Sequence, residues 1–259
     1  MLKPKVCVLR SAGTNCDKET SNAFLLAGAK PELLHINSLV NASRTLDDFH
    51  ILALPGGFSY GDDVASGKIL ANQLRFKLAD SLHKFIAAGK LIIGICNGFQ
   101  ILVKSGLLPH GAKLRQDTSL IINDSAKFED RWVYLKSGGR CVWTKDLKQI
   151  IYLPVAHGEG KFVTLDKNVL NSLKTKKQIV FQYCDVEGKL SGYPDNPNGS
   201  IENIAGICDS TGRILGLMPH PERHIFSKHH PRNWNLKSEK FGDGLQIFKN
   251  GVDFIKKNF

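Results

Sequence analysis

A cysteine flanked by two glycines is the residue of this chain best suited to act as a nucleophile. Residues 90–102, KLIIGICNGFQIL, run from an apolar strand into Gly94-x-Cys96-x-Gly98 and then into a helix that begins near Asn97. Glycine at both flanking positions permits a tight strand-to-helix turn that projects the Cys96 side chain into a cleft. The positive end of the helix dipole favours the thiolate. The pattern therefore predicts covalent catalysis, although an isolated G-x-C-x-G is as often a structural thiol in a tight turn.

Two backbone N–H groups are candidates for stabilising the oxyanion that such a nucleophile would create. One belongs to Asn97, which directly follows Cys96. The other belongs to Gly57, in PGGFSYGD, a turn expected at the carboxyl end of a neighbouring strand. Backbone donors aimed at developing negative charge are a common source of catalytic stabilisation.

A histidine between two prolines is the first candidate for the general base. LGLMPHPERH places His220 between Pro219 and Pro221, with Glu222 two residues further on. Because Pro221 disfavours helical geometry at His220, the segment should be extended, and alternate side chains should point to the same side. Glu222 can then fix the tautomer of His220 and stabilise its cation, as in a catalytic triad with a thiol nucleophile. Taken alone, the motif is more often a plain turn after a strand.

Other histidines offer alternatives. His157, in PVAHGEGKF, lies in a glycine-rich loop with Glu159 likewise two residues on, and is a second candidate base. His224, His229 and His230 could in principle bind a metal. No carboxylate or thiol completes a recognisable ligand spacing around them, so we predict a solvated loop and no metal site.

The elements that must position these residues follow an alternating pattern. In the first hundred residues, strand-like and helix-like stretches alternate, which is typical of a parallel sheet with helices on its faces. Thr14 and Asp17 resemble a capping box that starts a helix ending at Gly28, and apolar spacing predicts another helix over residues 69–88. The predicted strands are residues 5–9, 32–36, 50–54 and 91–95.

The second half changes character. From about residue 131 to 218, shorter β-like runs are separated by Gly, Asn, Pro and Lys clusters, and we expect them to extend the sheet and decorate one edge. Near the end of the chain, apolar residues from Phe241 to Phe259 recur at steps of four and three. This spacing predicts an amphipathic helix that covers the core.

Composition limits the class of protein. With 259 residues, 42% hydrophobic and 23% charged, the chain is expected to form one globular domain, 1–259. Six cysteines without close CxxC pairing indicate reduced thiols, and no apolar run approaches a membrane span, so the expected location is the cytoplasm. The net charge of +11 is scattered without a basic motif, so no nucleic-acid partner is predicted. Part of it could still attract a phosphate-bearing substrate or an acidic partner.

Taken together, the motifs resemble those of class I (triad-type) glutamine amidotransferases, and within them the glutamine-hydrolysing subunits of phosphoribosylformylglycinamidine synthase. GICNGFQ and MPHPE are shared with the wider class, whereas FSYGDDVASGKILA, PVAHGEGKF and GYPDNPNGSIENIAGICDSTGRILGLMPHPER are typical of the purine-biosynthetic subunits. The resemblance covers nearly the whole chain. It implies a flavodoxin-like α/β fold, with a central, mostly parallel sheet, helices on both faces and a β-rich edge extension.

The resemblance also implies roles for individual residues. The loop that contains His157 and Glu159 would lie near the mouth of the site or the partner interface. The implied site residues are Cys96 as nucleophile, His220 as base and acid, Glu222 as its orienter, Gly57 and Asn97 as oxyanion donors, and Gln100 for the α-polar end of bound glutamine.

The implied activity is one part of a larger assembly. The chain would hydrolyse glutamine and pass ammonia to a synthetase subunit, which uses ATP to convert formylglycinamide ribonucleotide to the amidine, with a small third subunit in the complex. The sequence contains no P-loop GxxxxGK[ST], so we expect no cofactor in this chain, and ATP and Mg²⁺ in the partner. Residues 161–177 and 223–240 depart from the family pattern, which leaves the partner contacts open. The alternatives are an amidotransferase serving another synthetase, a related thiol hydrolase or peptidase, and a non-catalytic interaction or nucleic-acid-binding protein.

Overall fold

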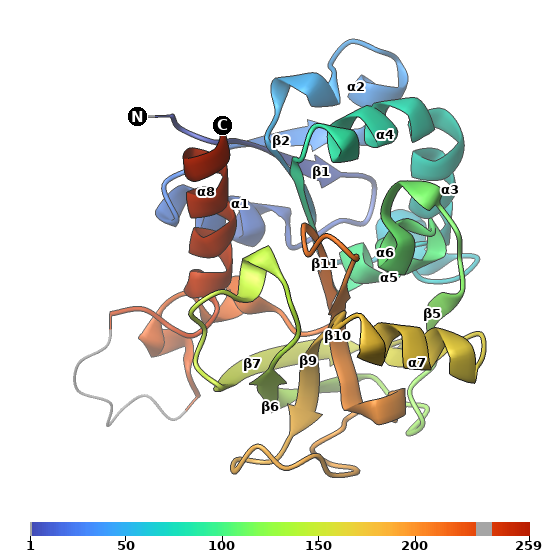
Figure 1. The fold of residues 1–259 in the computed structure, drawn as a ribbon, viewed down its shortest axis with the longest axis vertical. Coiled ribbons are helices and arrows are strands. Elements are labelled where there is room, and N and C mark those ends of the chain that lie inside the picture. The colour runs from blue at the N-terminus through green and yellow to red at the C-terminus, as the bar shows by residue number, and fades with distance from the viewer. Residues whose placement is uncertain (1, 232–239) are drawn as a thin grey trace.

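A mixed sheet runs through residues 2–231 and 240–259, the part of the chain that this computed structural model describes (Figure 1). Among these residues the sheet has nine strands, of which the first five in spatial order are parallel and the rest pair antiparallel. The spatial order is β2 (Lys30–His35), β1 (Lys5–Arg10), β3 (Ile51–Leu54), β4 (Leu91–Ile95), β11 (Ile214–Leu217), β10 (Ile204–Cys208), β9 (Ile179–Cys184), β6 (Glu129–Ser137) and β7 (Ile150–His157). A separate antiparallel pair joins β5 (Thr118–Ile121) to β8 (Lys161–Thr164).

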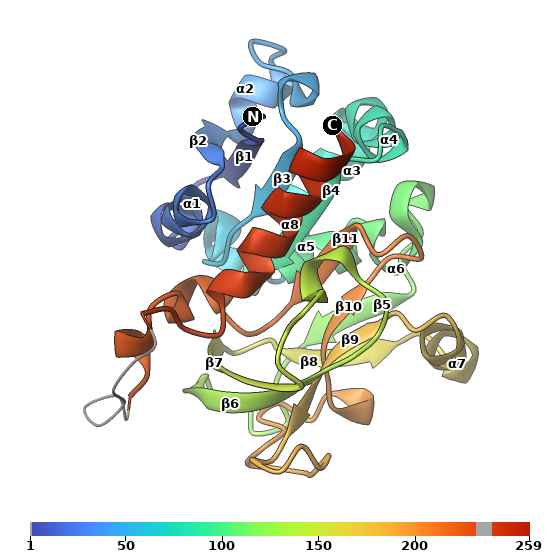
Figure 2. The same ribbon diagram turned by 60° about the vertical axis from the view of Figure 1, so that its left-hand side comes forward.

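Helices cover both faces of the parallel strands (Figure 2). On one face, α1 (Asp17–Leu26) packs against α8 (Leu245–Asn258), with the rings of Phe24 and Phe248 meeting edge-on at 5.0 Å. The other face carries α3 (Lys68–Lys77), α4 (Ala79–Ala87) and α5 (Asn97–Lys104). The remaining helices are α2 (Ile36–Val40), α6 (Leu107–His110) and α7 (Lys167–Thr175).

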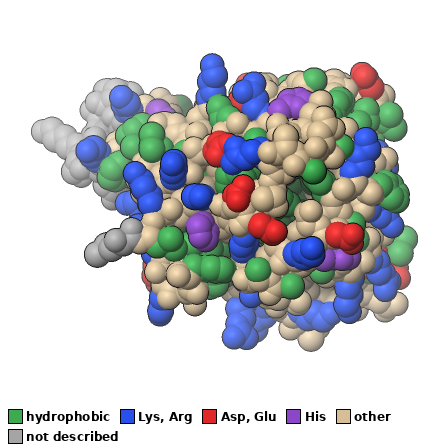
Figure 3. Space-filling view, turned by 90° about the horizontal axis from the view of Figure 1, so that it is seen from above, with side chains coloured by type: hydrophobic (Ala, Val, Ile, Leu, Met, Phe, Trp, Pro, Cys, Tyr) green, Lys and Arg blue, Asp and Glu red, His purple; other side chains and the backbone are tan. Residues whose placement is uncertain are grey.

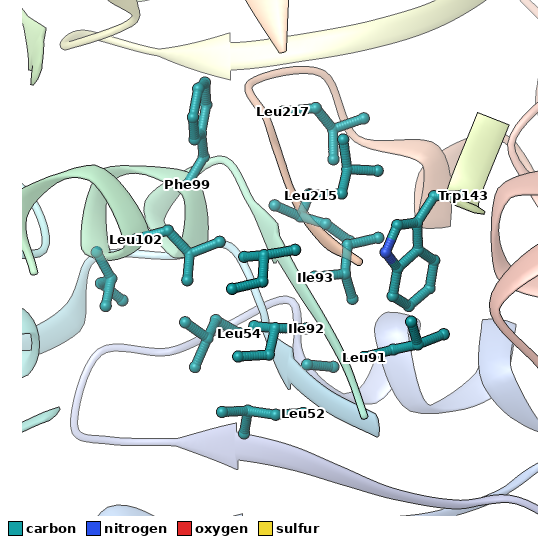
Figure 4. Close-up of a cluster of buried hydrophobic side chains, with 14 of the residues drawn as sticks. Leu52, Leu54, Leu91, Ile92, Ile93, Phe99, Leu102, Trp143, Leu215 and Leu217 are labelled. Atoms are coloured by element: carbon teal, nitrogen blue, oxygen red, sulfur yellow. The ribbon is translucent and has the colours of Figure 1, made fainter. Parts of the chain in front are cut away.

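The central strands are apolar along their whole length because helices bury them from both sides. Every residue of β3, β4 and β11 is buried. Figure 4 shows leucines and isoleucines of these strands between Phe99 and Leu102 of α5 on one side and Trp143 on the other. The ends of β3, β4 and β11, from which the predicted site residues emerge, are therefore held in a rigid core.

The predicted elements of the first half are largely confirmed. The strand over 91–95 is β4, and the other three predicted strands match β1, β2 and β3 to within two residues at each end. The single helix over 69–88 is wrong, because Leu78 leaves helical geometry (φ −124°, ψ 14°) and separates α3 from α4. The capping box is also wrong. Cys16 is the residue before α1, while the Thr14 hydroxyl accepts a hydrogen bond from the Ser11 N–H.

The β-rich half extends the sheet as predicted, but it does more than decorate an edge. β11 is the last of the parallel strands, between β4 and β10, and pairs in register with β4 from Ile92 to Ile95. The segment after β11, which contains His220, consequently begins beside the residue that follows β4. The predicted C-terminal helix is α8, although Phe241 and Phe259 lie outside it.

The two stretches that depart from the family pattern differ in how they fold. Residues 161–177 contain β8 and α7. The second stretch begins within the 3-10 turn Pro221–His224 and contains another, Ser227–His229, whereas its residues 232–239 lie outside the described residues. On the face shown in Figure 3, Lys and Arg side chains are scattered among acidic and apolar ones. No helix among the described residues is both long and apolar enough to span a lipid bilayer.

Candidate active site

Cys96 occupies a strained turn between β4 and α5. Its φ of 51° and ψ of −107° lie in a region that non-glycine residues rarely adopt, at a cost of about 1–3 kcal/mol. The flanking glycines allow close packing: a Cβ on Gly98 would lie 1.9 Å from the Leu54 carbonyl oxygen, and one on Gly94 would lie 2.5 Å from the Gly98 carbonyl oxygen. The predicted turn is present, but its glycines let α5 sit against the strands, while the backbone strain falls on the cysteine itself.

The two predicted oxyanion donors lie at adjacent strand ends. Asn97 is the first residue of α5, and Gly57 (φ 136°) follows β3, the parallel neighbour of β4. Among the hydrogen bonds of the described residues, neither backbone N–H has an acceptor. The Asn97 side chain ties the start of α5 to the loop after β3, since its oxygen accepts from the Ser59 N–H at 3.2 Å and its nitrogen donates to Asp62 at 3.2 Å. Both N–H groups therefore remain available to bind an oxyanion.

The structure pairs His220 with Glu222. The Nδ1–H of His220 donates to the Glu222 carboxylate at 2.6 Å, and both side chains are almost fully buried. His220 avoids helical geometry as predicted (φ −102°, ψ 89°), but Pro221–His224 form a 3-10 turn, so Glu222 reaches the ring from this turn and not by strand alternation. The His220 backbone N–H donates to the Pro154 carbonyl of β7 at 2.8 Å. The base is thus oriented through both its ring and its backbone.

The Cys96 thiol and Nε2 of His220 are not joined by a hydrogen bond in this structure. With Nδ1–H held by Glu222, Nε2 is the atom that can take the thiol proton, and it is buried without a partner among the described residues. The Cys96 S–H instead points to the Ala156 carbonyl at 3.6 Å. Burial disfavours a charged imidazole, but the Glu222 carboxylate, assisted by the neighbouring Cys96, outweighs it and holds the pKa of His220 well above its usual value. Hydrogen bonds between catalytic groups are often long before substrate binds and shorten in the complex. The geometry therefore suits proton transfer from Cys96 to His220.

His157, the alternative base, is held as a neutral ring. It is buried, its Nδ1 donates to the Asn123 side-chain oxygen at 3.1 Å, and its Nε2 faces the amide of Asn198 at 3.4 Å. Burial, assisted by the charge of His220, lowers the pKa of His157 to about 4. A base with so low a pKa binds protons weakly at neutral pH, so the structure favours His220 for this role.

Gln100 is predicted to hold the α-polar end of glutamine, but both its side-chain nitrogen and its side-chain oxygen already have hydrogen-bond partners. Its nitrogen donates to the Glu159 carbonyl at 2.7 Å, and its oxygen accepts from the Asn97 side chain at 2.9 Å. One turn further along α5, the buried Lys104 ammonium donates to the Ser66 carbonyl at 2.6 Å and to Glu159 at 3.4 Å. These bonds hold the loop of His157 and Glu159 against α5. The substrate role of Gln100 stays a prediction, because it requires one of these bonds to exchange.

Several residues at the site do not follow from the sequence motifs. Lys104 could have been identified from the sequence, because it stands four residues beyond Gln100 and therefore on the same face of the predicted helix. Asn123 and Cys16 had none in their immediate surroundings. Among the described residues, one group of His, Cys and acidic side chains lies within ligand reach, and it consists of Cys16, His220 and Glu222.

The remaining histidines lie apart from that group. His224 is buried and donates its Nδ1–H to the Tyr152 carbonyl at 2.7 Å, and its ring lies 5.0 Å from that of Trp132. The predicted solvated loop is therefore wrong for His224, which an aromatic cluster encloses. His230 is half-buried and belongs to the same cluster, with its ring 5.8 Å from that of Trp132.

Comparison with known proteins points to one family. A model of the CobB/CobQ-like glutamine amidotransferase domain matches residues 3–255. Phosphoribosylformylglycinamidine synthase subunit PurQ of Dehalococcoides mccartyi is 49% identical over 99% of this chain and 100% of its own length, and PurQ of Methanococcus maripaludis (strain S2) is 45% identical over 98% of each chain.

Comparison with solved structures points to the same family. A chain of PurLQS from Thermotoga maritima superposes with a TM-score of 0.74 at 32% identity, over 98% of this chain and 100% of that one. A glutamine amidotransferase from the same organism, at 15% identity and a TM-score of 0.53 over 99% of this chain and 86% of that one, shares the fold. The strand-to-helix cysteine, the buried His–Glu pair and full-length identity above 40% therefore lead to the same conclusion: this chain belongs to the glutamine amidotransferases, and within them to the family of phosphoribosylformylglycinamidine synthase subunit PurQ.

Proposed function

We propose that this chain is the glutaminase subunit of a phosphoribosylformylglycinamidine synthase. The observation that carries the proposal is the junction of β4 and β11, where Cys96 stands in its strained turn beside the buried His220–Glu222 pair. The PurQ relatives, which match along their whole length, support the assignment to purine biosynthesis.

The chemistry follows from the three side chains. His220 takes the proton of Cys96 at Nε2, and the thiolate attacks the carboxamide carbon of glutamine. The resulting oxyanion is bound by the N–H groups of Gly57 and Asn97, each worth about 3 kcal/mol in the transition state. The protonated His220 gives its proton to the leaving ammonia, and the C–N bond breaks to leave a γ-glutamyl thioester. Water deprotonated by His220 then hydrolyses the thioester to glutamate and restores the thiol.

Ammonia from this site is useful only if another subunit consumes it. In the proposal, a synthetase subunit binds ATP, Mg²⁺ and formylglycinamide ribonucleotide and converts the last to formylglycinamidine ribonucleotide, with a small third subunit in the assembly. A complex of this kind is named in the Thermotoga maritima structure. The chain itself acts as one domain, 1–259, without a cofactor of its own, and works in the cytoplasm.

The decisive experiment measures release of glutamate from glutamine by the wild-type chain and by Cys96→Ala. Each is assayed alone and with the synthetase partners, ATP and formylglycinamide ribonucleotide. We expect activity that the partners stimulate and that Cys96→Ala abolishes. Glutamate release that survives in Cys96→Ala would contradict the mechanism. Activity with the partners of another synthetase, but not with these, would keep the chemistry and reject the pathway.

A further inference from the structure

A second buried thiol lies beside the base, and the proposed chemistry does not use it. Cys16 is 1% exposed, and its Sγ is 4.0 Å from Nδ1 of His220, the atom that donates to Glu222. One ligand-type atom from each of the three residues falls within 4.8 Å of the others. The sulfur therefore stands beside the ring nitrogen that makes the base–carboxylate hydrogen bond.

The position of this sulfur is fixed from several directions. Its S–H donates to the Asn15 side-chain oxygen at 3.1 Å, and Nη2 of Arg223 donates to the sulfur at 3.1 Å. The backbone N–H of Cys16 donates to the Gly56 carbonyl at 3.2 Å, and its carbonyl accepts from the Thr20 hydroxyl at 2.7 Å. Burial raises the pKa of Cys16, so the group is a neutral thiol at pH 7. It is thus a fixed, uncharged part of the site.

Gly56 shows how tightly the thiol, base and nucleophile enclose one space. A Cβ built on Gly56 would lie 2.8 Å from Cε1 of His220, 3.2 Å from Sγ of Cys16 and 3.4 Å from Cβ of Cys96. Three groups from three separate segments thus converge on a single residue of the loop that also carries the predicted oxyanion donor Gly57. A change in the size of the Cys16 side chain would be transmitted directly to the imidazole.

The Glu222 carboxylate accepts from Nδ1 of His220 and is fully buried. A water molecule admitted beside Nδ1 would bind this carboxylate, spread its charge and weaken its bond to His220. A thiol fills the position without competing, because S–H is a weak donor and Asn15 already accepts it.

We propose that Cys16 is a positioning residue for the general base: its sulfur excludes water from the His220–Glu222 hydrogen bond and anchors Arg223 behind it. This inference rests on the proposed glutaminase function. It predicts an effect on the base and not on glutamine binding, because the sulfur of Cys16 contacts the base next to Nδ1, the atom that is bonded to Glu222.

The test compares Cys16→Ala and Cys16→Ser with Cys7→Ala, which removes an equally buried thiol from the middle of β1. We expect Cys16→Ala to lower kcat for glutamine about tenfold, the effect of weakening one charge-assisted hydrogen bond, with KM changed by less than about twofold. Cys16→Ser, whose hydroxyl refills most of the space beside Nδ1, should recover part of the loss. Cys7→Ala should keep the wild-type kcat.

A second readout separates positioning from loss of structure. The rate at which iodoacetamide alkylates Cys96 is measured against pH, because it reports the thiolate–imidazolium pair directly. The charged and titratable groups around the ring are Glu222, Cys96, Cys16, Arg223 and His157. Cys16→Ala removes the Cys16 thiol and admits water to the Glu222 carboxylate. The alkaline limb of the alkylation profile, where His220 loses its proton, should therefore move to lower pH.

Two results would overturn the inference. One is a Cys16→Ala protein with wild-type kcat and an unchanged alkylation profile. The other is an equal loss of kcat in Cys16→Ala and Cys7→Ala, which would indicate general destabilisation. If the wild-type complex releases no glutamate, the proposed function fails, and the alkylation profile still decides whether Cys16 positions His220.

Discussion

Substituting Gly98 by alanine tests whether the fit of α5 against the sheet sets the catalytic geometry. Gly98 lies in the first turn of α5, and alanine in a helix is normally favoured over glycine by up to about 1 kcal/mol. Here the new Cβ would lie 1.9 Å from the Leu54 oxygen and 2.7 Å from the Leu54 carbonyl carbon, whereas real Cβ atoms essentially never approach other atoms within 3.0 Å. The first turn of α5 must therefore move away from β3 by about 1 Å.

That movement displaces the catalytic groups that begin the same helix. Cys96 and the Asn97 N–H precede Gly98 directly, while Gly57 stays with β3. A misplacement of about 1 Å costs on the order of 100-fold in rate. We therefore expect Gly98→Ala to lower kcat about 100-fold, and to lower the free energy of unfolding by only about 1–3 kcal/mol, as for other overpacked cores.

The assay is steady-state glutamate release with the synthetase partners, alongside urea unfolding of the same preparations. Gly138→Ala is the matched control, because a Cβ there meets no atom within 4 Å. The reasoning is refuted if folded Gly98→Ala keeps kcat within about twofold of the wild type, or if Gly138→Ala loses as much activity.

Three further substitutions probe single interactions. Glu222→Gln removes the charge that raises the pKa of His220, so the alkaline limb of kcat/KM should move to lower pH and kcat should fall between about 10²- and 10⁴-fold, measured by pH-resolved kinetics. His157 has a folded pKa of about 4, below its usual 6.5, so the unfolded chain binds the proton first and stability is lost as pH falls from 6.5 towards 4. The free energy of unfolding, measured with urea at pH 7 and at pH 4.5, should fall less between these two pH values in His157→Asn than in the wild type, by up to about 3 kcal/mol. Lys104→Met deprives the Ser66 carbonyl and Glu159 of a donor and should destabilise the fold by about 1–3 kcal/mol, whereas the exposed Lys113→Met should not.

The parts of the site that sequence could predict are those in which one short motif carries the chemistry. The turn around Cys96 is recognisable because an apolar strand, two glycines and a helix follow one another without interruption. The His220–Glu222 contact is also predictable, but for the wrong reason, since a 3-10 turn and not an extended strand brings the carboxylate to the ring. Residue spacing allows both geometries.

The parts that sequence could not predict depend on distant segments. The break at Leu78 has neither proline nor glycine to signal it, so apolar spacing continues through it. Cys16 reaches the base only because the loop after β1 and the loop after β3 cross-link, with the Phe58 N–H donating to Gly13 and the Cys16 N–H to Gly56. A general signal existed, since sites in parallel sheets gather at the carboxyl ends of strands. It could not single out Cys16 among the residues there.

The placement of β11 explains why the β-rich half is needed for catalysis at all. Because Leu217 pairs with Ile95 in register, the residues after both strands emerge side by side, and the Cys96 N–H donates to the Leu217 carbonyl at 2.8 Å. The base is then fixed from the antiparallel part, where Pro154 of β7 accepts the His220 N–H. The position of the nucleophile thus depends on the parallel strands, whereas the position of the base depends on both the parallel and the antiparallel strands. A flavodoxin-like core without the antiparallel extension would hold the Cys96 thiol but would leave His220 without its backbone hydrogen bond to Pro154.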